Sequence, residues 1–181
     1  MFKTHNSIVN GRKISMERVF QEAKAFVTRA RRLDHSLIGR TATKEEIALL
    51  NAHFGDKIPT WYCRLITEVP LIHIEVGWQA YESQDSCEGL AYVEIYQPRD
   101  MVYESFKAYP GISILNRGYV CIGGDPIGSG DPYFIHFDAD STAVYQVFQD
   151  AGVDAVQILA HGTKQVADSL ADFFQKGIVS K

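Results

Sequence analysis

The sequence predicts an α+β fold, because the period of its apolar residues changes along the chain. Before Pro70, apolar residues recur every three or four positions, as in amphipathic helices. After Pro70 they alternate with polar residues, as in half-buried strands, and helical spacing returns near the C-terminus. Helices, then about five strands, then a closing helix are the order of an α+β domain.

Length and composition indicate one globular unit. The chain has 181 residues, of which 46% are hydrophobic and 22% charged, which is enough to bury a core without disulfides or metals. Its net charge of −4 gives no overall basic field for direct binding to nucleic acid. The local basic stretch at 29–32 is interpreted as the solvated end of a helix, with a phosphate or membrane contact as the alternative.

The cysteines and the lack of targeting segments indicate a cytoplasmic protein. Cys63, Cys87 and Cys121 are odd in number and widely spaced, which favours reduced thiols over a disulfide framework or a zinc site. No apolar run approaches the length of a membrane span, and no signal-peptide core follows Met1. We therefore expect no membrane partner.

The N-terminal part should contain three helices. Residues 1–14 are expected to be loosely ordered because Asn10-Gly11 is a turn signal, and an amphipathic helix should begin near Ser15. Thr43 and Glu46 form a capping box that should open a second helix, which Gly55 should end. Pro59 suits the first turn of a third helix. We divide the chain into an N-terminal extension, 1–40, and a compact domain, 41–181.

The second half should contain the sheet and the closing helix. Asp100 is expected to cap a short helix after the first two strands, which should form an antiparallel hairpin. The closing helix should present Val166, Leu170, Phe173 and Phe174. The expected strands are 72–78, 90–96, 119–122, 133–137 and 144–148.

No constellation of residues in the sequence predicts catalysis, a cofactor or a metal. The glycine-rich segment 123–132 lacks the Lys-Ser/Thr of a phosphate-binding loop and is more typical of a connection between strands. His136, Asp138 and Asp140 alternate as metal ligands could, but an ordinary strand and turn give the same pattern. No serine or cysteine has the sequence context of a nucleophile.

Four segments, in their order and spacing, resemble the SMI1/KNR4 family, also called the SUKH superfamily. They span about 135 residues from Thr43 onward, and residues 1–40 have no counterpart. The residues that carry the resemblance are Ile58, Pro59, Trp61 and Tyr62 in the first segment, Ile122, Gly123, Gly128, Gly130 and Asp131 in the second, Val144 and Tyr145 in the third, and Ser169 and Phe173 in the fourth.

The resemblance implies a mixed or antiparallel sheet of about six strands with helices packed on one side, and a binding surface without catalytic groups. It also implies an immunity protein that neutralises a cognate toxin by direct binding, such toxins often being nucleases or deaminases. The alternative function is a scaffold or regulator of cell-wall synthesis or signalling. An enzyme that acts on a small molecule is the third candidate function. We expect a monomer or a weak homodimer.

We expect aromatic and acidic residues on and beside the sheet to bind a cationic toxin, since aromatic side chains anchor interfaces and complementary charge speeds association. The alternative is that half or more of these aromatic residues belong to the core. The candidate partner-binding residues are Trp78, Tyr81, Glu82, Asp85, Glu88, Tyr92, Tyr96, Asp125, Asp131 and Tyr133.

Overall fold

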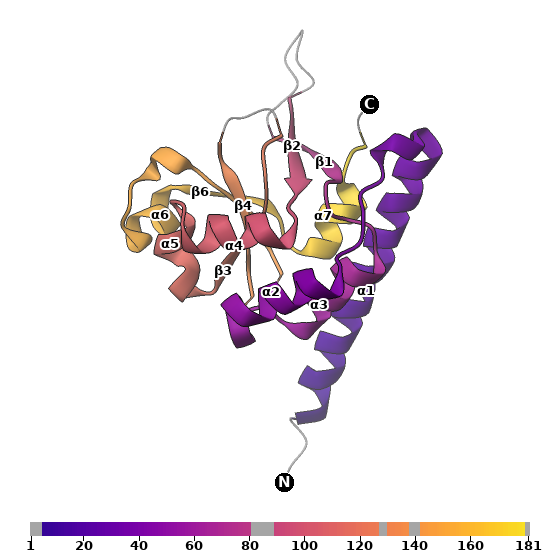
Figure 1. Cartoon of the computed structure of the whole chain (residues 1–181), viewed down its shortest axis with the longest axis horizontal. Coiled ribbons are helices and arrows are strands. Elements are labelled where there is room, and N and C mark those ends of the chain that lie inside the picture. Colours follow the sequence, from indigo (N-terminus) through magenta and orange to yellow (C-terminus); the bar gives the residue numbers. More distant parts are fainter. Residues whose placement is uncertain (1–4, 81–88, 127–129, 138–141, 180–181) are drawn as a thin grey trace.

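The computed structural model describes residues 5–80, 89–126, 130–137 and 142–179, with side chains from Met16 onward, and confirms the α+β class (Figure 1). The helices are α1 (His5–Leu33), α2 (Lys44–Phe54), α3 (Thr60–Glu68), α4 (Pro98–Phe106), α5 (Gly111–Ile114), α6 (Ala155–His161) and α7 (Leu170–Lys176). The strands are β1 (Glu75–Gln79), β2 (Leu90–Ile95), β3 (Tyr119–Gly124), β4 (Pro132–His136), β5 (Val144–Val147) and β6 (Thr163–Ala167).

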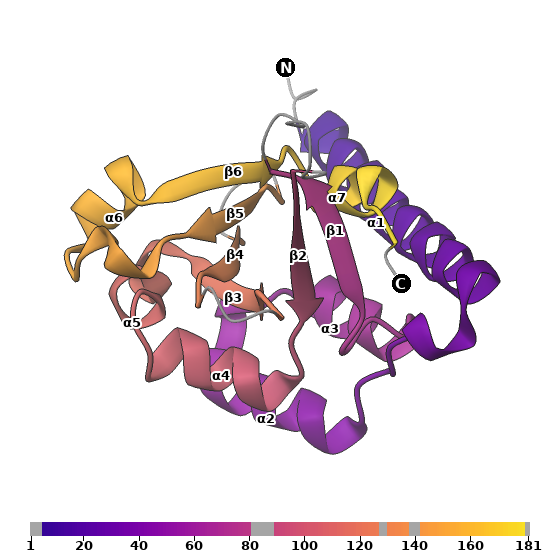
Figure 2. The same cartoon turned by 90° about the horizontal axis from the view of Figure 1, so that it is seen from above.

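The six strands form one antiparallel sheet in sequence order, β1 to β6, and the sheet is strongly curled (Figure 2). The curl brings the last strand back toward the first. The Lys164 ammonium on β6 donates to the Ala80 carbonyl, 2.6 Å away, and lies 5.2 Å from the centre of the Trp78 ring. This contact links the two ends of the sheet.

Strand alternation divides the apolar residues between two cores. On β4, Tyr133 and Ile135 enter the larger core with residues of α1, α2, α3 and α7, whereas Phe134 enters a smaller one. Ile114 of α5 and Ile158 of α6 complete the smaller core. The structure therefore adds a second layer of short helices to the single helical layer that the resemblance implied.

The two terminal helices pack against each other. The rings of Phe26 on α1 and Phe174 on α7 are 6.1 Å apart, and both side chains are buried. Arg29 donates from Nη2 to the carbonyls of Phe174, Gln175 and Gly177 at 2.8, 3.4 and 3.2 Å, so one guanidinium binds the C-terminal end of α7. The N-terminal helix thus shares the larger core of the domain.

After α7 the chain pairs with the edge of β1. Ile178 and Gly77 exchange two backbone hydrogen bonds of 2.8 Å, which satisfies part of an edge that would otherwise be open. A Cβ on Gly77 would lie 2.9 Å from Cε1 of Tyr92 and 3.1 Å from the Ile178 carbonyl, so glycine is needed for this close approach.

Several predicted boundaries are confirmed. The Thr43 hydroxyl accepts from the Glu46 amide and the Glu46 carboxylate accepts from the Thr43 amide, so the capping box is present. Gly55 ends α2 with a φ of +54°. Pro59 is the N-cap of α3, one position before the first turn where we had placed it. Among the described residues, none of the helices has the length and apolar character needed to cross a membrane.

Three predictions about local structure are wrong. The first helix begins at His5 and runs through Asn10-Gly11, since one glycine inside a helix costs only about 1 kcal/mol. Gln97, not Asp100, is the N-cap of α4, and its side-chain amide donates to the Asp100 carboxylate. Val166 lies in β6, where pairing with β5 outweighs its helical spacing, and α7 begins only after Ser169.

Replacing Arg29 with Met should lower the free energy of unfolding by about 1–3 kcal/mol, because the charge-assisted bonds to three carbonyls and the contact of the guanidinium with the Phe26 ring are lost. Urea unfolding followed by circular dichroism measures the difference. Arg31→Met, an exposed position on the same helix, is the control and should change little. Equal effects of the two substitutions would contradict the role of Arg29.

Candidate functional site

The outward side of β1 and β2 carries acidic and aromatic side chains. Glu75 lies directly opposite Glu94 across the antiparallel pair, and Tyr92 lies opposite Gly77. Their neighbours Val76 and Val93 enter the larger core, so alternation places these polar residues on the other face. Two carboxylates directly opposite each other on a sheet repel.

Tyr96 and the start of α4 extend this surface. A Cβ on Gly124 would collide with the Tyr96 hydroxyl, so the ring lies across the end of β3. Burial raises the pKa of the Tyr96 hydroxyl, and the nearby Cys121, Glu104, Glu94 and Asp100 raise it further. We define the acidic face as Glu75, Tyr92, Glu94, Tyr96, Asp100 and Glu104.

On the acidic face, the surroundings of Glu104 disfavour its ionised form. Burial and the neighbouring Asp100 carboxylate raise the pKa of Glu104. Both effects penalise the ionised form, which is nonetheless the form that neutral pH favours for an ordinary carboxyl group. A cation arriving from outside would relieve this penalty, which makes Glu104 suited to a positively charged partner.

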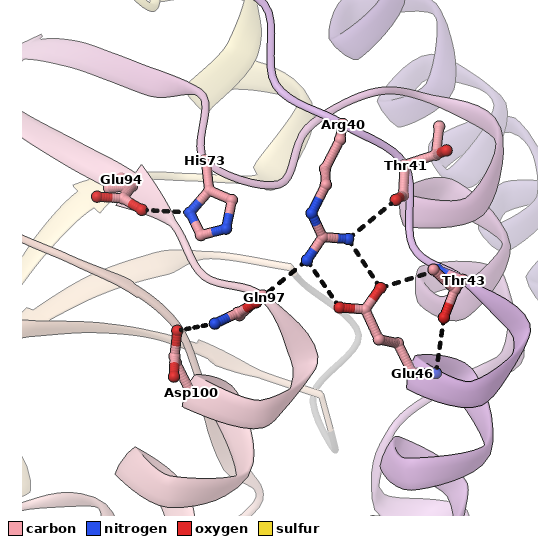
Figure 3. A network of polar contacts seen from close by, with 8 residues as sticks. All are labelled: Arg40, Thr41, Thr43, Glu46, His73, Glu94, Gln97 and Asp100. Atoms are coloured by element: carbon pink, nitrogen blue, oxygen red, sulfur yellow. Dashed lines mark hydrogen bonds and ion pairs between the residues drawn. The ribbon is translucent and has the colours of Figure 1, made fainter.

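A network of hydrogen bonds supports the acidic face from one side (Figure 3). Arg40 makes a bidentate pair with Glu46, at 2.8 and 2.7 Å, and also donates to the Gln97 side chain at 3.1 Å. Gln97 in turn donates to the Asp100 carboxylate at 2.9 Å. Because Arg40 bridges α2 and the start of α4, it fixes the position of Asp100 without neutralising it.

His73 supports Glu94 in the same view. Its Nδ1 lies 2.6 Å from Oε1 of Glu94, and both side chains are partly exposed (Figure 3). His73 has a φ of +65°, in the left-handed region that side chains other than glycine rarely adopt. Its amide donates to the Ile95 carbonyl, and the two flanking residues Ile72 and Ile74 are buried. Backbone pairing on both sides therefore holds the imidazole over β2.

The structure separates the predicted partner-binding residues. Tyr92 and Tyr96 lie on the acidic face, and Asp125 directly follows Gly124, which pairs with Glu94. Trp78 and Tyr133 are buried, 8% and 1% exposed, and contact each other through a 3.3 Å hydrogen bond, so they belong to the core rather than to the surface we predicted for them. Tyr81, Glu82, Asp85 and Glu88 lie outside the described residues.

Asp131 has a structural contact: its carboxylate accepts from the Gln149 amide at 3.0 Å. The sequence patterns did not predict the contribution of Glu75, Glu94, Asp100 and Glu104 to this surface. Outward positions in the strand pattern could have revealed the first two. The contribution of Asp100 and Glu104 depends on α4 packing beside Tyr96, which no local pattern encodes.

The residues that carry the family resemblance are mostly structural. Ile58, Tyr62, Ile122, Gly123 and Phe173 are buried. Trp61 is partly exposed, and its ring lies 5.8 Å from that of Phe137. Gly130 has a φ of +82° and Ser169 caps α7, whereas Gly128 lies outside the described residues.

Two shallow hollows flank α3. One, of about 270 Å³, lies between α1 and α3, and the other, of about 330 Å³, lies between α2 and α3 and includes Cys63. Burial raises the pKa of the Cys63 thiol, which keeps it protonated. Tyr62 and Cys121 have pKa values raised by complete burial, and neither residue lines these hollows. Within the described residues, no three side chains that could hold a metal ion gather.

Comparison of the chain with family models, with curated proteins and with solved structures gave no match.

Replacing Arg40 with Met should lower the free energy of unfolding by roughly 0.5–1 kcal/mol at pH 7, since the bidentate pair is partly exposed. The hydrogen bond from Arg40 lowers the pKa of Glu46 below its ordinary value of 4.5. A lowered folded pKa means that the contribution is complete above about pH 4.5 and is lost as the pH falls through the folded value.

Urea unfolding at pH 7 and at pH 3 tests this dependence. The difference between the wild type and Arg40→Met should shrink at pH 3, whereas Arg117→Met, an exposed control, should match the wild type at both. A difference that stays the same at both pH values would show that Arg40 acts through packing and not through the Glu46 carboxylate.

Proposed function

We propose that the protein is a binding protein that neutralises a cationic protein toxin, with the acidic face as its docking surface. The toxin is a nuclease or deaminase, and neutralisation follows from direct binding in the cytoplasm, with no catalytic step. The resemblance to the SMI1/KNR4 family supports this class of function, because bacterial members commonly act as immunity proteins.

The observation that carries the proposal is the separation of charge along the chain. Residues 1–68 contain 12 Lys and Arg against 7 Asp and Glu, whereas residues 69–181 contain 6 against 15. The net charges of the two parts are therefore +5 and −9, which the overall value of −4 conceals. All strands of the sheet lie in the acidic part, so the field on that side favours a basic partner.

The composition of the acidic face fits the same class of partner. Tyr92 and Tyr96 provide partly exposed rings, which anchor interfaces at low cost in side-chain entropy. Their carboxylate neighbours Glu94, Asp100 and Glu104 can receive lysine or arginine side chains. Nucleases carry basic surfaces that contact phosphates, and an inhibitor that covers such a surface blocks access to the substrate.

A scaffold or regulator of cell-wall synthesis or signalling remains the second candidate. The shape of α1 favours it: its N-terminal half extends past the rest of the domain and offers a separate docking element (Figure 1). A scaffold would retain housekeeping enzymes in a pull-down, whereas an immunity protein would retain a toxin encoded next to it.

The test is a pull-down of the tagged full chain from its source cells, followed by co-expression with any toxin that co-purifies. We expect the wild type to bind the toxin and restore growth. The double substitution Asp100→Lys/Glu104→Lys should weaken binding at least tenfold and abolish rescue. Asp150→Lys is the matched control, since it changes one exposed charge near α6, and should rescue as the wild type does. Recovery of only housekeeping enzymes would reject the proposal.

Glu104→Gln should separate stability from binding. Because the pKa of Glu104 is raised in the folded chain, its ionised form destabilises the protein once the pH exceeds the ordinary value of 4.5. The substitution should therefore raise the urea midpoint at pH 7 and leave it nearly unchanged at pH 4, while weakening toxin binding. If Glu104→Gln lowers the midpoint at pH 7, the carboxylate is structural and not held for a partner.

A further inference from the structure

The hollow between α1 and α3 is an apolar patch with charged edges on the side of the domain that carries the basic part of the chain. Met16, Phe20 and Trp61 provide the apolar surface, and each is partly exposed. Glu17, Lys24 and Arg64 surround them. The Arg64 guanidinium lies 4.8 Å and the Lys24 ammonium 6.0 Å from the centre of the Phe20 ring.

The charges at this hollow are balanced, which distinguishes it from the acidic face. Arg64 pairs with Glu68 at 2.6 Å, and Glu17 lies on the same edge as Lys24. A uniformly acidic or basic partner would therefore meet repulsion as well as attraction. With Arg64 paired to Glu68, Glu17 and Lys24 present one charge of each sign on α1, and a second copy in antiparallel orientation presents the complementary pair.

The spacing of Glu17 and Lys24 fits such a copy. The two exposed residues stand seven positions apart on α1, about 10.5 Å along the helix, with Phe20 between them. If a second α1 lies antiparallel across the first with the crossing at Phe20 and Gln21, the order of the two charges is reversed. Each Glu17 then faces the other copy's Lys24, and the two Phe20 rings meet at the two-fold axis.

The length of α1 supports the same arrangement. The helix has 29 residues and spans about 44 Å. Figure 1 shows that its N-terminal half extends past the body of the domain. Isolated helical turns are marginally stable in water, so a second antiparallel helix alongside would support this extension.

We propose that α1 is the interface of a symmetric homodimer, in which two copies pack antiparallel through Met16, Phe20 and Trp61 and are fixed in register by reciprocal Glu17–Lys24 pairs. The interface is isologous, since the same patch serves both copies. It lies on different elements from the acidic face, so the dimer would leave that face open and present two of them.

Sedimentation velocity of the full chain over a concentration series tests the proposal. The wild type should show a dimer that dissociates on dilution. Glu17→Lys and Lys24→Glu should each weaken self-association at least tenfold, because each single variant places like charges opposite each other twice. A mixture of the two variants should associate as the wild type does, because in the mixed dimer opposite charges face each other again at both reciprocal pairs.

Arg117→Glu, an exposed charge reversal outside α1 and α3, is the control and should dimerise normally. Circular dichroism of each variant excludes misfolding as the cause. A chain that is monomeric at every concentration would overturn the proposal and leave the hollow to another occupant. So would a dimer that tolerates both reversals, or a mixture that fails to associate. Toxin binding separates the two proposals. If only the dimer proposal fails, Glu17→Lys and Lys24→Glu still bind the toxin as the wild type does.

Discussion

The packing of the two chain ends against each other is the constraint on which the rest of the structure depends. Phe26 lies on α1 and Phe174 on α7, and the whole sheet lies between these helices in the sequence. Arg29 binds the C-terminal end of α7 through three carbonyls. The segment after that helix then pairs with Gly77 on β1. Because this pairing holds β1 in place at the edge of the sheet, it fixes the position from which the six-stranded meander begins.

The division of the sheet into two faces follows from that placement. With Val76 and Val93 committed to the core, alternation sends Glu75, Tyr92 and Glu94 outward. The repulsion between the paired carboxylates is a cost that folding alone does not require, since neutral residues would serve the same strands. Natural sequences often accept such local conflicts where a surface binds a partner, and this placement adds to the separation of charge that carries our proposal for the acidic face.

How far the sequence predicts this arrangement depends on how local each determinant is. The capping box at Thr43 and Glu46, and the alternating pattern of β2, involve residues close together in the chain, and both are confirmed. β6 was missed because its residues Thr163–Ala167 are only partly buried and alternate weakly, so pairing with β5 defines the strand. Four of the six residues of the acidic face were missed, and two of these, Asp100 and Glu104, join it only because α4 meets Tyr96 through tertiary packing.

The separation of charge has a consequence for assembly as well as for binding. A molecule with +5 on its first 68 residues and −9 on the remainder could associate head to tail, basic part to acidic part, and such contacts build open chains. A closed antiparallel α1 pair would oppose this outcome, because it buries part of the basic half in a symmetric contact. The acidic faces of both copies would then remain available to a cationic partner, and excess negative charge on the outside would keep dimers apart from one another.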